Sequence, residues 1–149
     1  KILNYIKVAR DEGGSILFGG NPIKLNNRCS NGWFIQPTII EGVSNKSKIN
    51  QEEIFGPLAT IIPFEDENEA INIANDTTYG LSATIWSKDD LKLERVSNKV
   101  NAGVIWTNCW LVRDLRTPFG GMKNSGYGRE GGQEAIRFFT EQKTICKTI

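Results

Sequence analysis

Short apolar runs alternate along the chain with stretches whose apolar residues recur at helical spacing. The runs of strand length are residues 15–18, 33–40, 58–64, 81–86 and 103–107. The stretches of helical spacing are residues 1–12 and the segments that follow Asp66, Ser87 and Gly132. Strands that alternate with such helices predict βαβ units with right-handed crossovers. We therefore expect an α/β fold with a mostly parallel, twisted sheet and flanking helices.

Several ends of these elements can be predicted from single residues. Asp66 has the side chain of a helix cap, with Glu69 three positions later, and Ser87 is expected to cap the next helix. The last helix is expected to place Phe138 and Phe139 on its packed side. Residues 143–149 form a β-prone tail, which is either the last strand of the same sheet or a strand that pairs with a neighbouring subunit.

The segment Pro118–Gly132 contains six glycines between a strand and the last helix. It also carries Phe119 and Tyr127, which suit packing, so we expect a shaped loop rather than a flexible linker. Gly126–Gly131 matches the G-x-G-x-x-G pattern of dinucleotide-binding folds. No strand directly precedes it and no acidic residue follows at the required distance, so glycines that simply enter a helix are the favoured interpretation.

Composition excludes several classes of function. The net charge is +1 with no long block of one sign, which gives no reason to expect nucleic acid or a membrane surface as partner. No apolar run approaches the length of a membrane span. The chain has no histidine, so neither a histidine base nor histidine-ligated zinc exists within it, and we expect no metal site. Cys29, Cys109 and Cys146 are typical of reduced thiols in a cytoplasmic protein, and no fixed base near Cys109 supports a nucleophile.

Two segments carry candidate binding residues. In residues 51–57, the carboxylate of Glu53 could hold ribose hydroxyls while Phe55 packs on a flat cofactor. From the residues alone, a solvated acidic loop in which Phe55 fills the core is the favoured alternative.

The second segment, residues 107–117, follows the end of a strand, where ligands of open α/β sheets bind. Asn108 could orient a polar group and Trp110 could form an apolar wall. Arg113 or Arg116 could bind a carboxylate through two hydrogen bonds. The alternative for the arginines is a surface ion pair with Asp114, which contributes little.

Four motifs in order resemble the aldehyde dehydrogenase superfamily, and the resemblance covers essentially the whole chain. They are Glu52–Pro57, Asn75–Ala83, Gly103–Asn108 and Pro118–Gly126. The resemblance is to the C-terminal part of that family, whose cysteine nucleophile, glutamate base and main cofactor-domain residues lie further upstream. It implies that residues 1–140 are the latter part of a catalytic domain, that residues 141–149 are an oligomerisation strand, and that no catalytic residue lies in this chain. A first residue Lys1 rather than Met, already in a helical pattern, agrees with a part of a longer protein.

The resemblance also implies roles for single residues. Glu53 takes the place of the glutamate on the nicotinamide ribose and Phe55 that of the aromatic residue beside it, which reverses the preference stated above. Phe119 resembles the phenylalanine that lines the substrate pocket. Arg129 and Glu141 resemble a guanidinium–carboxylate pair near the subunit interface. NAD is the expected cofactor, although NADP stays open, and a homo-oligomer is the expected assembly.

Within the superfamily, residues 108–121 most resemble the 2-aminomuconic and 2-hydroxymuconic semialdehyde dehydrogenases. The substrates of those enzymes carry a carboxylate far from the aldehyde, and a cationic side chain in the substrate tunnel could bind it. We expect Arg113 rather than Arg116 to bind it, because Arg113 lies nearer the end of the strand. The alternatives are a non-catalytic binding or assembly module and an aldehyde dehydrogenase for neutral aldehydes.

Overall fold

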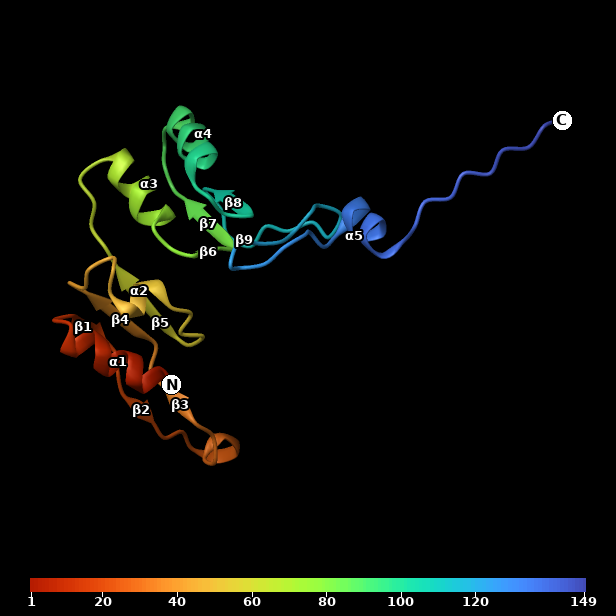
Figure 1. The fold of residues 1–149 in the computed structure, drawn as a ribbon. Helices are drawn as coiled ribbons and strands as arrows, with labels where there is room; N and C mark the ends of the chain where they lie inside the picture. The colour runs from red at the N-terminus through yellow and green to blue at the C-terminus, as the bar shows by residue number, and fades with distance from the viewer. The chain divides into compact units, whose positions relative to one another are not determined.

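In the computed structural model, which describes residues 1–149, the chain divides into two units, Lys1–Thr77 and Thr78–Ile149. This division does not coincide with the expected boundary at residue 140, which stays a prediction. No helix is both long enough and apolar enough to cross a bilayer. Figure 1 shows the elements of both units along the chain.

The first unit is built on a three-stranded sheet in the order β1–β4–β5 (Figure 1). The central strand β4 (Thr38–Glu41) pairs antiparallel with β1 (Ser15–Phe18) and parallel with β5 (Leu58–Ile61). Between β1 and β4 lie two strands of two residues each, β2 (Pro22–Ile23) and β3 (Phe34–Ile35), which pair antiparallel. The short 3-10 helix η1 (Asn27–Cys29) lies between them in the chain. Short α2 (Lys48–Gln51) connects β4 to β5.

Helix α1 (Ile2–Asp11) supplies the other side of this unit's core. Its Tyr5 and Ala9 cluster with Ile40 of β4, which is completely buried. The remaining buried members are Val43, Ile49 and Ile54. Burying one such aliphatic side chain stabilises the fold by about 1.5–3 kcal/mol, so this cluster is the main source of order in the unit.

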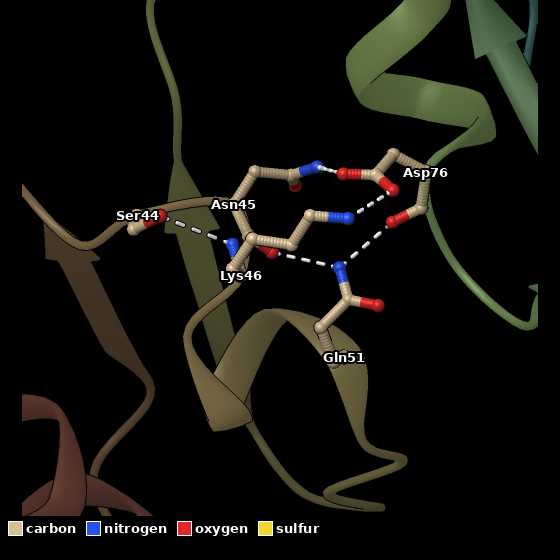
Figure 2. Close-up of polar contacts among 5 residues, drawn as sticks. All are labelled: Ser44, Asn45, Lys46, Gln51 and Asp76. Carbon is tan, nitrogen blue, oxygen red and sulfur yellow. Dashed lines mark hydrogen bonds and ion pairs between the residues drawn. The ribbon is translucent and has the colours of Figure 1, made fainter.

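Helix α3 (Glu67–Asn75) begins as the sequence predicts, because the Asp66 side chain accepts a hydrogen bond from the Glu69 amide at 2.9 Å. Its other end is held by the polar contacts of Figure 2. The Asp76 carboxylate accepts from Asn45 Nδ2 at 2.9 Å and pairs with Lys46 Nζ. Gln51 Nε2 donates to the carbonyl oxygens of both Asn45 and Asp76 at 2.7 Å. The loop after β4 is therefore fixed to the end of α3.

The second unit contains the βαβ unit of β7 (Ser82–Ile85), α4 (Asp90–Lys99) and β8 (Val104–Thr107). The two strands pair parallel, from Ser82 opposite Val104 to Ile85 opposite Thr107. Beside them, β6 (Tyr79–Gly80) pairs antiparallel with β9 (Met122–Lys123), and α5 (Gly132–Phe139) follows the glycine loop. The buried apolar residues of this unit are Leu93 of α4, Trp106 of β8 and Ala102, which precedes β8.

The sheet differs from the expected one. Three of the five strand pairs are antiparallel, and the strands form four small sheets, so "mostly parallel" is wrong for this chain while mixed α/β is right. The parallel pair β7–β8 is joined through α4, as the pattern predicts, whereas β4–β5 is joined through α2, a short helix that the pattern does not predict. The alternation of strands and helices does not predict which strands form the three antiparallel pairs.

Two smaller expectations also need correction, and a third stays untested. Asp89, not Ser87, caps α4 by accepting from the Lys92 amide, and Ser87 instead accepts from the Asp89 amide. Phe138 and Phe139 are exposed within this chain, although their rings meet edge to face at 4.9 Å. Residues 141–149 form no strand, so the oligomerisation strand stays a prediction.

Candidate functional site

The acidic loop after α2 is held against α1 by polar contacts. Tyr5 Oη donates to Glu52 Oε2 at 2.5 Å, and Lys1 Nζ donates to the Glu53 carbonyl oxygen at 2.8 Å. Ile54 turns inward and is buried. The carboxylate of Glu53 is left at the exposed surface, where it can accept hydrogen bonds from hydroxyl groups.

Phe55 is placed next to this carboxylate in an unusual backbone conformation. Its φ is +57°, a left-handed value that is uncommon for a bulky residue, and its side chain is 84% exposed. The expectation from the residues alone that Phe55 fills the core is therefore wrong, because Ile54 occupies that role. An exposed ring held by a costly backbone conformation beside a carboxylate fits the flat, hydroxyl-bearing end of a nucleotide cofactor.

In the second unit, Asn108 begins the candidate substrate loop at the end of β8. Its φ is +50°, and its side-chain amide makes two bonds to the backbone of Ser87: Oδ1 accepts from the amide at 2.9 Å and Nδ2 donates to the carbonyl at 2.8 Å. The Asn108 main-chain amide also donates to the Ile85 carbonyl, which extends the β7–β8 pairing. In this structure Asn108 therefore positions the loop.

The rest of this loop is anchored by Trp106 of β8. The buried indole of Trp106 donates from Nε1 to the Val112 carbonyl oxygen at 2.8 Å. Between these anchors Leu111 has a φ of +55°, and Trp110 is exposed. The two anchors make residues 108–112 a shaped projection that presents Trp110 as an apolar surface.

The two arginines of the loop have different partners. Arg116 donates from Nε to both Asp114 carboxylate oxygens, at 2.9 and 3.0 Å. These hydrogen bonds lower the pKa of Asp114 and raise the pKa of Arg116. Arg113 lies over the Phe119 ring, with its guanidinium carbon 4.3 Å from the ring centre. Its Nη2 also donates to Glu130 Oε1 at 3.1 Å.

The glycine loop is shaped by backbone contacts, as the sequence predicts. Phe119 and Glu130 exchange two main-chain hydrogen bonds of 2.8 Å. Gly103, before β8, lies so close that an added Cβ would be 1.7 Å from the Gly120 carbonyl oxygen. Arg129 Nη1 donates to the carbonyls of Gly121 and Gly128, at 2.8 and 2.7 Å. Its pairing with Glu141, which is exposed on the tail, stays a prediction.

An open cavity of about 410 Å³ lies between the glycine loop and α5. Its lining includes Leu81, Phe119, Arg129, Glu130, Phe138 and Phe139. A cavity of this size, with apolar walls and a few charged groups, is typical of small-molecule sites. Of the substrate residues predicted from the sequence, Phe119 lines it directly, and Arg113 reaches it through the Phe119 ring and Glu130.

The structure thus brings together Arg113 and Phe119, and adds Glu130, which sequence reasoning did not select. Seventeen positions separate Glu130 from Arg113, and no local spacing reports their pairing. The one available signal was its position at the end of the glycine loop. Glu53 and Phe55 belong to the other unit.

Comparison with known proteins shows which family the chain belongs to. The model of the aldehyde dehydrogenase family matches residues 1–145. A 2-aminomuconic semialdehyde dehydrogenase of Danio rerio is 51% identical over 147 residues, which are 97% of this chain. The chain spans about 30% of that relative's length.

Solved structures give the same result. HpcC from Thermus thermophilus is 44% identical with a TM-score of 0.90, over 97% of this chain and 28% of that one. The AldA indole-3-acetaldehyde dehydrogenase of P. syringae, in complex with NAD+ and IAA, is 39% identical with a TM-score of 0.88, over 95% of this chain and 28% of that one. With its family model matched along nearly its whole length, the chain belongs to the aldehyde dehydrogenase family.

Proposed function

We propose that this chain is the C-terminal portion of an NAD-dependent aldehyde dehydrogenase that oxidises a carboxylate-bearing semialdehyde of the 2-aminomuconic or 2-hydroxymuconic type. The net reaction converts an aldehyde, water and NAD+ into a carboxylic acid, NADH and a proton. The identity to a 2-aminomuconic semialdehyde dehydrogenase supports the substrate class.

The observation that carries the substrate class is the difference between the two arginines. Arg116 is neutralised by the carboxylate of Asp114 through two Nε contacts, whereas Arg113 lies over the ring of Phe119, which lines the cavity. An aromatic face holds a guanidinium in place while its in-plane N–H groups stay available as donors. Arg113 is therefore the cation suited to hold the remote carboxylate, and Phe119 and Trp110 provide apolar walls for the carbon chain.

The cofactor contacts proposed for this chain are Glu53 and Phe55. The exposed Glu53 carboxylate accepts hydrogen bonds from ribose hydroxyls, and the exposed Phe55 ring packs against the flat nicotinamide end. NAD, when bound, accepts the hydride that the aldehyde carbon loses. Neither residue contacts the adenosine ribose in this proposal, and the 2′ position of that ribose is where NADP differs from NAD, so NADP is compatible with both.

We assign no catalytic residue to this chain. Cys29, Cys109 and Cys146 are free thiols, and none shows a hydrogen-bonded base of the kind that activates a nucleophile. The proposal places the nucleophile and the general base in the part of the enzyme that precedes these residues. Free thiols agree with a cytoplasmic location, which is also part of the proposal.

The same proposal includes assembly into a homo-oligomer. Residues 141–149 are exposed and carry Ile145 and Ile149, whose apolar side chains have no cover within this chain. A β-prone tail of this kind gains backbone partners by pairing with a sheet edge of a second subunit. Arg129 and Glu141 are the polar pair proposed near that interface.

The experiment that tests the substrate assignment compares Arg113→Ala with the matched variant Arg116→Ala in the full-length enzyme. A charge-assisted hydrogen bond contributes roughly 1.5–3 kcal/mol, so Arg113→Ala should raise KM for a carboxylated semialdehyde roughly 10- to 100-fold. KM for a neutral aldehyde of similar size should change little. Arg116→Ala should leave both values near those of the unmodified enzyme.

Steady-state kinetics on the two substrates give the answer. An equal loss on both substrates would show that Arg113 supports the fold or the cavity in general. A selective loss in Arg116→Ala alone would move the carboxylate contact to that residue. Either result contradicts the assignment of Arg113.

A further inference from the structure

Arg113 already has a carboxylate partner before any substrate arrives. Its Nη2 lies 3.1 Å from Glu130 Oε1, and this is a single contact that leaves the other guanidinium donors available. The side chains are 44% and 68% exposed, respectively. An exposed ion pair of this kind is weak and exchanges its partner readily.

The backbone keeps Glu130 beside the site. It is paired to Phe119 by two main-chain hydrogen bonds of 2.8 Å. The next residue, Gly131, has a φ of +86°, and a Cβ there would lie 2.5 Å from the Thr117 carbonyl oxygen. This turn has no room for a larger residue, so the position of Glu130 relative to the Phe119 ring is fixed by main chain.

We infer that Glu130 is a specificity-determining residue: it is a resident counter-charge on Arg113 that a substrate carboxylate must displace. This inference rests on the proposed function, in which Arg113 holds that carboxylate. A neutral aldehyde has no group that displaces Glu130, so its binding leaves the ion pair with Arg113 intact. Two carboxylates on one guanidinium repel each other, so Glu130 weakens the binding of the preferred substrate in return.

The test is Glu130→Gln in the full-length enzyme, which keeps the size of the side chain and removes its charge. KM for the carboxylated semialdehyde should fall roughly two- to five-fold, the range of an exposed ion pair, while KM for a neutral aldehyde stays unchanged. In the Arg113→Ala background the same substitution should change neither KM. Glu130→Asp, which retains the charge, should bind the carboxylated substrate no better than the unmodified enzyme.

Glu134→Gln is the matched control. Glu134 Oε1 pairs with Arg137 Nη1 at the same 3.1 Å, on α5, and its removal should alter neither KM. Two results would overturn the inference: an unchanged or raised KM for the carboxylated substrate in Glu130→Gln, or an equal change on both substrates.

The two proposals fail in different ways. If Arg113→Ala shows no selectivity for carboxylated substrates, the proposed function and this inference both fall. If Arg113→Ala is selective and Glu130→Gln is not, only the role of Glu130 is wrong. Should Glu130→Gln unfold, Glu130→Ala, which also removes the charge, compared with and without Arg113, still reports whether charge at this position competes with the substrate.

Discussion

Arg113 and Arg116 are three positions apart and yet have different surroundings. Arg116 and Asp114 form a closed pair at the surface, whereas Arg113 is shared between an aromatic ring and one carboxylate oxygen. Residue type alone does not separate them. The difference comes from the turn at residues 114–117, where the Thr117 and Arg116 amides bond back to Asp114.

This pairing has a measurable effect on the acid side of the pH range. Hydrogen bonds from Arg116 lower the pKa of Asp114, so the pair contributes stability above the ordinary aspartate range and loses it as pH falls through the lowered value. Arg116→Ala should raise the pKa of Asp114 toward its ordinary value. An NMR titration of the Asp114 carboxyl carbon measures this, and an unchanged midpoint would show that the pair does not persist in solution.

At the scale of elements, the shaped loop depends on close contact between the start of β8 and the glycine loop. Gly103→Ala would place a methyl group 1.7 Å from the Gly120 carbonyl oxygen, and backbone must move to relieve it. We expect the free energy of unfolding to fall by about 3 kcal/mol. Thr107→Ala, an exposed substitution at the other end of β8, should change it by less than about 0.5 kcal/mol.

Chemical or thermal unfolding of the two variants provides this comparison. Equal stability of Gly103→Ala and Thr107→Ala would mean that the glycine loop does not pack on β8 as described. The cavity beside Phe119 would then have no fixed wall.

Elements whose signals are local could be predicted from the sequence. Helix α1, the Asp66 cap of α3 and the β7–α4–β8 unit follow from spacing and capping residues within each short segment. The pairs β2–β3, β6–β9 and Phe119–Glu130 are one or two residues long, and their partners lie 11 to 44 positions apart. Spacing carries no information on such contacts. Ser87 and Asp89 are both residue types that cap helices and they lie two positions apart, so the sequence alone does not decide which of them caps α4.

The candidate site was predictable in part for the same reason. Motif resemblance indicated Glu53, Phe55 and Phe119, and the position just after a strand indicated Asn108, Trp110 and Arg113, because each lies within a short recognisable segment. It did not indicate that the Asn108 side chain bonds to Ser87 or that Glu130 pairs with Arg113. Those relations depend on where two loops meet in space.

At the scale of the whole molecule, the proposed function separates binding residues from catalytic residues. In the proposed function, the described residues supply a cofactor contact surface in one unit and an aromatic, cationic substrate wall in the other. None of them is given a catalytic role. The chain covers about 30% of a relative that is a dehydrogenase by name, which leaves room for the catalytic machinery in the rest of the protein.

The most direct test of this claim is NADH formation from a muconic-type semialdehyde, measured for the full-length protein and for the 149-residue chain at equal molar concentration. The account predicts turnover by the full-length protein and none by the chain alone. Turnover by the isolated chain, or a full-length protein that oxidises no aldehyde, would contradict it.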